Sequence, residues 1–299
     1  MPQEVPSGRI LLLKGESVSG KTHLMRAFRH SVHSNERGYC GYLQMTSQAS
    51  NYARYILVKL VDALDQPYCA PDVTTSGLSR LSLGLLESVP GFTPEERERL
   101  QDGDIPNLSQ TVEKYADRML ADARVHSSDL DLIWALLYLQ RNDARIKLRV
   151  LKWLRCEDLS AGDRALLGDL VPRTLDEWPQ QMIAHLGQLM GILHGMPLVL
   201  CVDQLEDMTE QEAAPDKFRR VMNTLVTIAE EIPSAVLVVA CLEDYYASHR
   251  QCTGAGQPRV EPSARWRGRR PPICLMMASP KRAPKGMDYP APGSVNPAG

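Results

Sequence analysis

The sequence has no strong net charge, no long apolar run and no leader pattern. Its 299 residues carry a formal net charge of −2, so no overall field draws nucleic acid or a membrane surface to it. No uninterrupted apolar stretch approaches the length needed to cross a bilayer. The opening MPQEVPSGR lacks the charged start and apolar core of a signal peptide. We therefore expect a cytoplasmic protein without membrane contact.

The seven cysteines include no C-x-x-C pair, so the chain shows neither the usual spacing of a zinc site nor a disulfide framework. Cys40, Cys201 and Cys241 each lie in or beside an apolar, strand-like run. We expect them to be small buried hydrophobic residues rather than reactive thiols. Such cysteines fit a reducing, cytoplasmic interior.

A short apolar run, residues 10–13, leads into the sequence GESVSGKT and then into a helical pattern. This is the motif G-x-x-x-x-G-K-[ST] in the strand, loop and helix context that a phosphate-binding loop requires. Its glycines let consecutive N–H groups turn inward, and the helix directs its positive end at the same phosphates. A chance Gly/Ser-rich turn is the alternative, but motif and flanks agree. We expect nucleotide contacts from the whole loop: Gly15, Glu16, Ser17, Val18, Ser19, Gly20, Lys21 and Thr22.

Two side chains of the loop and one distant carboxylate carry the expected chemistry. Lys21 can bridge the outer phosphates, and the Thr22 hydroxyl can ligate Mg²⁺. Residues 198–202 are apolar and end in Asp203. A buried parallel strand would carry Asp203 to the carboxyl edge of the sheet, beside the loop, where it can hold Mg²⁺ through water.

Apolar periodicity predicts an α/β fold with a parallel sheet. Strands are expected at residues 10–14, 38–45, 198–203 and 235–241, and their continuous apolar character indicates burial on both faces. The stretch after the second strand shows only helical segments and is too long for an ordinary crossover. We therefore divide the folded chain into a first part of the nucleotide-binding domain, a helical insertion or subdomain, and a second part of the domain: residues 1–64, 65–180 and 181–250.

The last segment, residues 251–299, differs in composition. It holds nine of the 21 prolines and the basic run RWRGRR, with little apolar periodicity. We expect it to be a disordered Pro/Arg-rich tail. The basic run could attract anionic polymers. The alternative interpretation is a truncated or frame-disrupted product, because the pattern before it predicts a further helix and a fifth strand.

Two acidic residues, Glu243 and Asp244, follow the last expected strand. A polar residue at this edge of the sheet can sense a terminal phosphate, so both are candidates for that role. A capping role before the turn at residues 245–249 is an equally good interpretation.

With the loop and the two later strands in place, the chain resembles the additional-strand P-loop ATPases, the group that includes AAA+ and STAND proteins. The resemblance covers about residues 8–249 and is specific at Gly15–Thr22 and at Leu198–Asp207. The wording VLCVDQLED resembles the D-Q-x-E variant of STAND-type switches. It implies a P-loop NTPase three-layer sandwich, with the strand at 235–241 between the loop strand and the Asp203 strand. It also implies ATP and Mg²⁺ as ligands.

The chain departs from the group in two ways. Many AAA+ proteins have Glu directly after the metal-binding Asp, where it activates water, whereas this chain has Gln204, which cannot act as a general base. Glu206 is the nearest replacement, so Lys21 and Glu206 are our candidate catalytic residues. By the resemblance, we also expect the C-terminal lid of the group to be missing. Slow hydrolysis, suited to a switch, is the resulting hypothesis.

The leading interpretation is an ATP-binding switch or motor module of a larger ATPase, which couples nucleotide state to movement of the helical insertion. A small-molecule kinase is a second hypothesis, with the insertion as a substrate lid. A third is a non-catalytic interaction scaffold with a degraded nucleotide site. A protein partner or homo-oligomer is compatible with the first, and the core indicates no nucleic acid.

Overall fold

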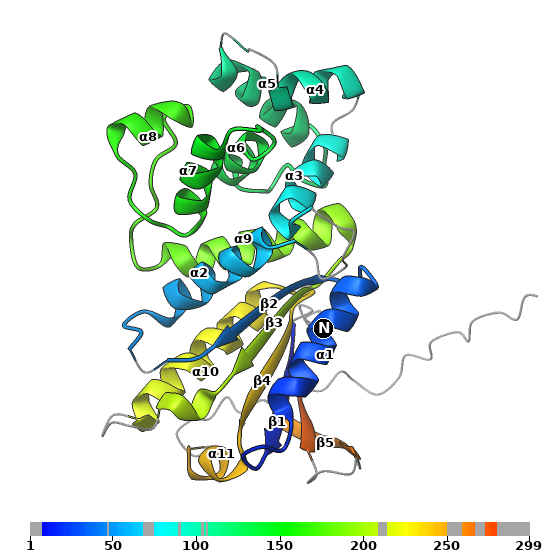
Figure 1. Cartoon of the computed structure of the whole chain (residues 1–299), viewed down its shortest axis with the longest axis vertical. Coiled ribbons are helices and arrows are strands. Elements are labelled where there is room, and N and C mark those ends of the chain that lie inside the picture. The colour runs from blue at the N-terminus through cyan, green and yellow to red at the C-terminus, as the bar shows by residue number, and fades with distance from the viewer. Residues whose placement is uncertain are drawn as a thin grey trace, which may run out of the picture.

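The computed structural model describes residues 8–46, 48–67, 75–88, 91–102, 105, 107–208, 214–249, 259–266 and 273–279. It shows an α/β protein in which a sheet lies at one end and a group of helices at the other (Figure 1). Across these residues, no helix has the length and apolar character needed to cross a membrane.

Four parallel strands form the main part of the sheet: β1 (Arg9–Gly15), β2 (Tyr39–Gln44), β3 (Leu198–Asp203) and β4 (Val236–Leu242). Their order is β2-β3-β4-β1. β4 therefore lies between the strand that leads into the loop and the strand that ends in Asp203, as the resemblance implied. Because the strands are parallel, their carboxyl ends meet at one edge of the sheet.

Two further strands extend the sheet beyond β1: β5 (Arg259–Trp266) and β6 (Ile273–Ser279). β6 pairs antiparallel with β1, and β5 with β6. The sequence predicts disorder over 251–299, and at these strands that prediction is corrected. Without a neighbour, β1 would present an edge of unpaired N–H and C=O groups, and the run ICLMMAS supplies a strand to pair with them. The rest of this segment lies outside the described residues.

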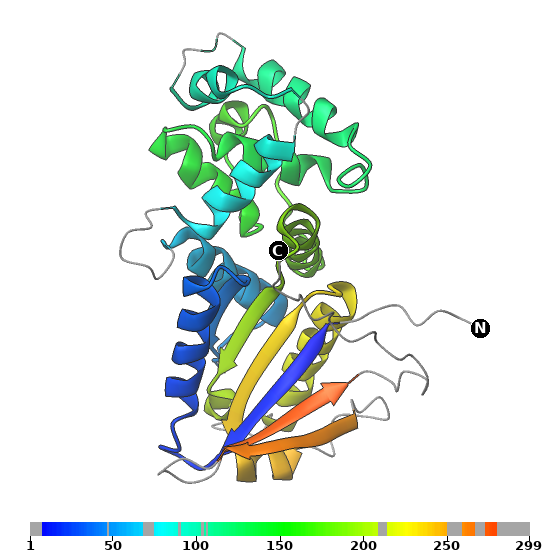
Figure 2. The same cartoon turned by 90° about the vertical axis from the view of Figure 1, so that its right-hand side faces the viewer.

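Helices cover both faces of the sheet (Figure 2). On one face, α1 (Lys21–Ser34) packs Met25 and Val32 against strand side chains that include Cys40 and Cys201. The other face carries three helices, which share one continuous apolar core with the strands: α2 (Tyr52–Asp65), α9 (Trp178–His194) and α10 (Ala214–Glu231). Burial on both faces explains why the strands are apolar throughout rather than alternating. The three strand cysteines are buried, as expected.

Among the described residues between α2 and α9 there are six helices, in the region where the sequence predicts a helical insertion (Figure 1). They pack around the buried Trp153 and Tyr138, on the side of α2 and α9 away from the sheet. Thr93 and Glu96 accept each other's backbone N–H and so form a capping box at the first turn of α4. The six are α3 (Gly77–Ser88), α4 (Pro94–Asp102), α5 (Leu108–Leu120), α6 (Leu130–Tyr138), α7 (Ala144–Leu154) and α8 (Ala161–Leu166).

Polar contacts join these helices to α2. Asp62 pairs with Arg155, and Asp65 pairs with Lys147 at 2.8 Å. Arg54 donates to two backbone carbonyl oxygens of the insertion. Since α2 follows β2 in the chain, these contacts link the helical insertion to the strand that lies beside β3.

His33, in the last turn of α1, carries a pH dependence of folding. Burial, together with the charges of Arg29 and His30, lowers its pKa from 6.5 to about 4, against a hydrogen bond with the backbone of Cys40 that raises it. Between these two pH values the unfolded chain binds a proton at this site and the folded chain does not. Stability contributed by the neutral ring is therefore present above about pH 6.5 and is lost as the pH falls toward 4.

We predict that His33→Gln weakens the dependence of the free energy of unfolding on pH between about 6.5 and 4, as measured by urea unfolding at a series of pH values. His126→Gln, at an exposed histidine outside α1, is the control and should leave the slope as in the parent. An unchanged slope in the His33 variant would contradict burial of a neutral imidazole.

Candidate functional site

The loop between β1 and α1 is a tight turn that bends at glycine. β1 ends at Gly15 and α1 begins at Lys21. Gly20, the N-cap of α1, has a φ of 96°, in the left-handed region that favours glycine, and no side chain caps this end of the helix. The first N–H groups of α1 therefore have no capping acceptor from a side chain. This arrangement of donors suits an anion.

Ser19 adds a second indication of a ligand at the same turn. Its side chain is buried in the loop, and its Oγ has no hydrogen-bond partner among the described residues. A buried hydroxyl without a partner costs about 1–3 kcal/mol. A phosphate oxygen in the loop would remove that cost, so the residue fits the expected ligand.

The side chain of Lys21 folds back onto the backbone of the loop. Its side chain is 7% exposed, and its Nζ donates to the carbonyl oxygens of Gly15 at 3.0 Å and Glu16 at 2.9 Å. An ammonium has three donor hydrogens, so one remains for another acceptor. The positive charge is thereby held at the mouth of the loop, where the outer phosphates of a nucleotide were expected.

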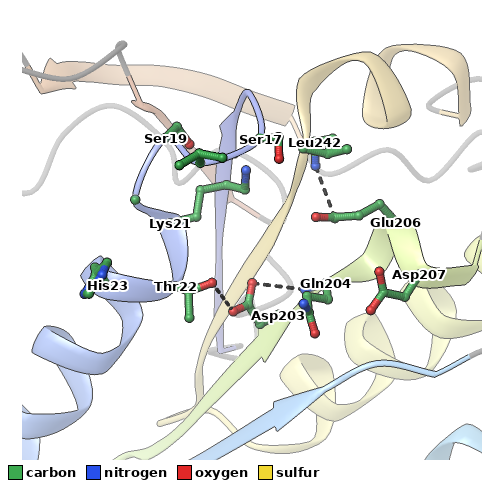
Figure 3. Close-up of a pocket in the computed structure, with 12 residues that line it drawn as sticks. Ser17, Ser19, Lys21, Thr22, His23, Asp203, Gln204, Glu206, Asp207 and Leu242 are labelled. Atoms are coloured by element: carbon green, nitrogen blue, oxygen red, sulfur yellow. Dashed lines mark hydrogen bonds between the residues drawn. The ribbon is translucent and has the colours of Figure 1, made fainter.

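Asp203 meets the loop at the start of α1 (Figure 3). Its Oδ2 accepts the hydroxyl of Thr22 at 2.7 Å, a contact between residues 181 positions apart in the chain. The same oxygen accepts the hydroxyl of Tyr42 at 2.9 Å, and Oδ1 accepts the backbone N–H of Gln204 at 3.0 Å. The residue is 1% exposed. Three donors thus orient a buried carboxylate toward the residue that the sequence predicts as its partner in metal binding.

The chain turns sharply after Asp203 and brings Glu206 back to the sheet. Gln204 has a φ of 60°, and the 3₁₀ helix η1 (Leu205–Met208) follows it. The Glu206 carboxylate accepts the backbone N–H of Leu242, the last residue of β4, at 3.3 Å (Figure 3). Burial raises the pKa of Glu206, while the charge of Lys21 opposes that rise.

These elements enclose a cavity of about 440 Å³. Most of the predicted site residues line it together, and Lys21 and Asp203 lie on the same side of the molecule. Gly15 and Glu16 do not line it but supply the two carbonyl oxygens that hold Lys21. The lining residues are Ser17, Val18, Ser19, Gly20, Lys21, Thr22, His23, Asp203, Gln204, Glu206, Asp207 and Leu242.

The charges of the cavity are mostly negative. Three carboxylates, Asp203, Glu206 and Asp207, face one ammonium, Lys21. Within the described ranges no group of three or more His, Cys, Asp or Glu side chains could hold a metal by itself. Mg²⁺ does not need such a group, because it is usually bound by one or two protein oxygens, waters and substrate phosphates. Thr22 and Asp203 fit that pattern.

Sequence reasoning missed four residues of the site: Tyr42, His23, Asp207 and Leu242. Tyr42 points at Asp203 only because β2 is the parallel neighbour of β3, with Tyr42 opposite Cys201. That pairing joins segments far apart in the chain, and no local pattern indicates it. His23 and Asp207 directly follow predicted site residues, so proximity in sequence was the available signal.

Glu243 and Asp244 take the structural role rather than a place in the cavity. They form the first turn of α11 (Glu243–His249), where acids favour the positive end of a helix. Glu243 pairs with Lys14 at 3.7 Å. Neither residue lines the cavity.

Comparison of the chain with protein-family models, with curated proteins and with solved structures finds no match. What the site does is therefore inferred from its own geometry.

Val18, at the tip of the loop, is held in an unfavourable backbone conformation. Its φ is 62° and its side chain is 88% exposed. For a residue with a side chain the left-handed region costs about 1–2 kcal/mol, and a β-branched residue is a marked outlier there. Exposure leaves little packing to offset this cost.

We predict that Val18→Gly raises the free energy of unfolding by about 1 kcal/mol. This is the relieved backbone strain minus the ~0.4–1 kcal/mol by which the more flexible glycine stabilises the unfolded chain. Denaturant unfolding measures the change. Val18→Ala keeps the β-carbon and should give a clearly smaller gain. A loss of stability in the glycine variant would show that the conformation is not strained.

Proposed function

We propose that this protein is an ATP-binding P-loop module, a switch or motor part of an ATPase. The observation that carries the proposal is the hydrogen bond between Thr22, at the head of α1, and Asp203, at the end of β3. It joins two separate sequence motifs in one cavity with Lys21. The position of β4 between β1 and β3 also supports the additional-strand P-loop group, because the resemblance implies that strand order.

Different residues of the site would bind the phosphates and the metal ion. The N–H groups of the loop, the Ser19 hydroxyl and Lys21 would bind the phosphates. Thr22 and Asp203 would hold Mg²⁺, which neutralises phosphate charge when bound. ATP rather than GTP rests on the resemblance alone. The P-loop NTPase three-layer sandwich belongs to the same proposal and is supported by helices on both faces of the parallel sheet.

Glu206 is the proposed general base. It is the carboxylate beyond Asp203 that both lines the cavity and reaches the end of β4. Its bond to the Leu242 N–H engages one carboxylate oxygen, which favours slow turnover. This suits a switch that remains in one nucleotide state for long periods.

The helical insertion is the proposed output of the switch. The α2 ion pairs at Asp62 and Asp65 connect the insertion to β2, and β2 contacts Asp203 through Tyr42. A change at the metal site therefore has a short physical route to the insertion. A protein partner or a second copy of the chain would bind the insertion differently after such a change.

A non-catalytic scaffold is the alternative that an observation favours. No arginine lines the cavity, so the lysine stands as its one fixed cation among the described residues. Such a site could bind nucleotide without turning it over. Phosphate release, measured with no added acceptor, separates this alternative from an ATPase.

We predict that Lys21→Met lowers the affinity for Mg²⁺–ATP by about 10- to 100-fold, because charged hydrogen bonds contribute roughly 1.5–3 kcal/mol each. Isothermal titration calorimetry measures the loss. Methionine keeps the aliphatic stem that packs in the loop. The matched control is Lys14→Met, one residue before the loop, where the lysine pairs with Glu243 and does not line the cavity.

The control should bind as the parent does. Absence of Mg²⁺-dependent ATP binding by the parent chain, or equal binding by the Lys21 variant, would overturn the proposed function.

We predict that Glu206→Gln lowers the rate of ATP hydrolysis by about 10²- to 10⁴-fold, the usual contribution of a general base, while Mg²⁺–ATP still binds. The base must be ionised, and burial raises its pKa. Activity of the parent should therefore fall, as the pH is lowered, through a pKa above the ordinary value of 4.5 for a glutamate. Glu243→Gln, outside the cavity, is the control. Unchanged turnover in the Glu206 variant removes this residue from the reaction.

A further inference from the structure

Tyr42 is a polar contact of the site that neither sequence motif contains. It lies in β2, and its hydroxyl donates to Asp203 Oδ2 at 2.9 Å. Thr22 donates to the same oxygen at 2.7 Å from the opposite element, α1. The backbone N–H of Gln204 holds the other oxygen, Oδ1, at 3.0 Å. Both carboxylate oxygens are thus held by donors, two from the separate elements α1 and β2 and one from the adjacent residue.

Tyr42 is the donor in this contact. An ionised carboxylate only accepts hydrogen bonds, so the phenol O–H supplies the hydrogen to Asp203 Oδ2.

Resting on the ATP-binding function proposed above, we infer that Tyr42 is a positioning residue for the divalent cation. It holds Asp203 in the rotamer that faces Thr22, so the two oxygen groups meet the metal already in place. A hydroxyl can coordinate a cation with its oxygen and still donate its hydrogen, so the Thr22–Asp203 bond persists with metal present. Tyr42 performs the same orientation from the other side without touching the metal or the nucleotide.

The cost of losing this contact should appear in metal affinity. Removal of an outer partner of a metal ligand usually weakens metal binding or activity by about 10- to 100-fold. Without the phenol, Asp203 Oδ2 keeps a single donor and the carboxylate gains freedom to rotate. Ordering it again on metal binding then costs free energy. The contacts between the loop and the nucleotide do not depend on the free energy of ordering the Asp203 carboxylate.

The experiment compares Tyr42→Phe with the parent chain in Mg²⁺ titrations at saturating ATP. We expect the Mg²⁺ concentration that gives half of the maximal binding or turnover to rise about 10-fold. We expect ATP affinity in EDTA to stay within about twofold. Titration with Mn²⁺, which binds nitrogen and oxygen sites more tightly than Mg²⁺, should show a partial recovery. A loss of folding alone would lower all of these signals together.

Tyr55→Phe is the matched control. The Tyr55 hydroxyl also donates to the end of β2, at the carbonyl oxygen of Gln44, but it does not contact Asp203. Its removal should leave the half-saturating Mg²⁺ concentration unchanged. If the parent and Tyr42→Phe bind ATP with the same Mg²⁺ dependence, the positioning role is wrong and the proposed function stands. If the parent binds no nucleotide with or without Mg²⁺, both are wrong.

Discussion

The site depends on one hydrogen bond, from the hydroxyl of Thr22 to the carboxylate of Asp203. It sets the spacing between the helix that follows β1 and the end of β3, although these strands are not neighbours. β4 separates them, so the sheet must keep its register across three strands for the two groups to meet. The helices on both faces contribute by burying these strands. The packing of the apolar core therefore also determines whether Thr22 and Asp203 can meet in the polar site.

Local patterns in the sequence predict much of this arrangement. The loop motif places its own backbone, because glycine, lysine and threonine act within eight residues of one another. Continuous apolar runs identify the four parallel strands, since burial on both faces removes the alternation of an exposed sheet. The capping box at Thr93 is local in the same way, because it is a contact between near neighbours in the chain. In each case the interacting residues are close to one another in the sequence, so a short stretch of sequence is enough to predict the structure.

The remaining features depend on distant or conformational information. Tyr42 reaches Asp203 through strand pairing, which a single sequence does not encode locally. Glu206 faces the cavity because Gln204 adopts a left-handed backbone conformation. A glutamine does not predict that conformation from the sequence. β5 and β6 lie in a proline- and arginine-rich segment whose composition predicts disorder. Their formation follows from the open edge of β1, which becomes visible once the strand order is known.

The charges of the cavity make the proposed ligands depend on each other. A triphosphate that entered without metal would meet the carboxylates of Asp203, Glu206 and Asp207, and among the described lining residues it would find one ammonium, Lys21, beside the N–H groups of the loop. Lys21 also gives two of its hydrogens to the loop carbonyls. A divalent cation between the phosphates and Asp203 converts the nearest repulsion into an attraction. By linkage, each proposed ligand must raise affinity for the other by the same factor, so metal and nucleotide act as one signal. A switch built this way responds to the complex rather than to either component.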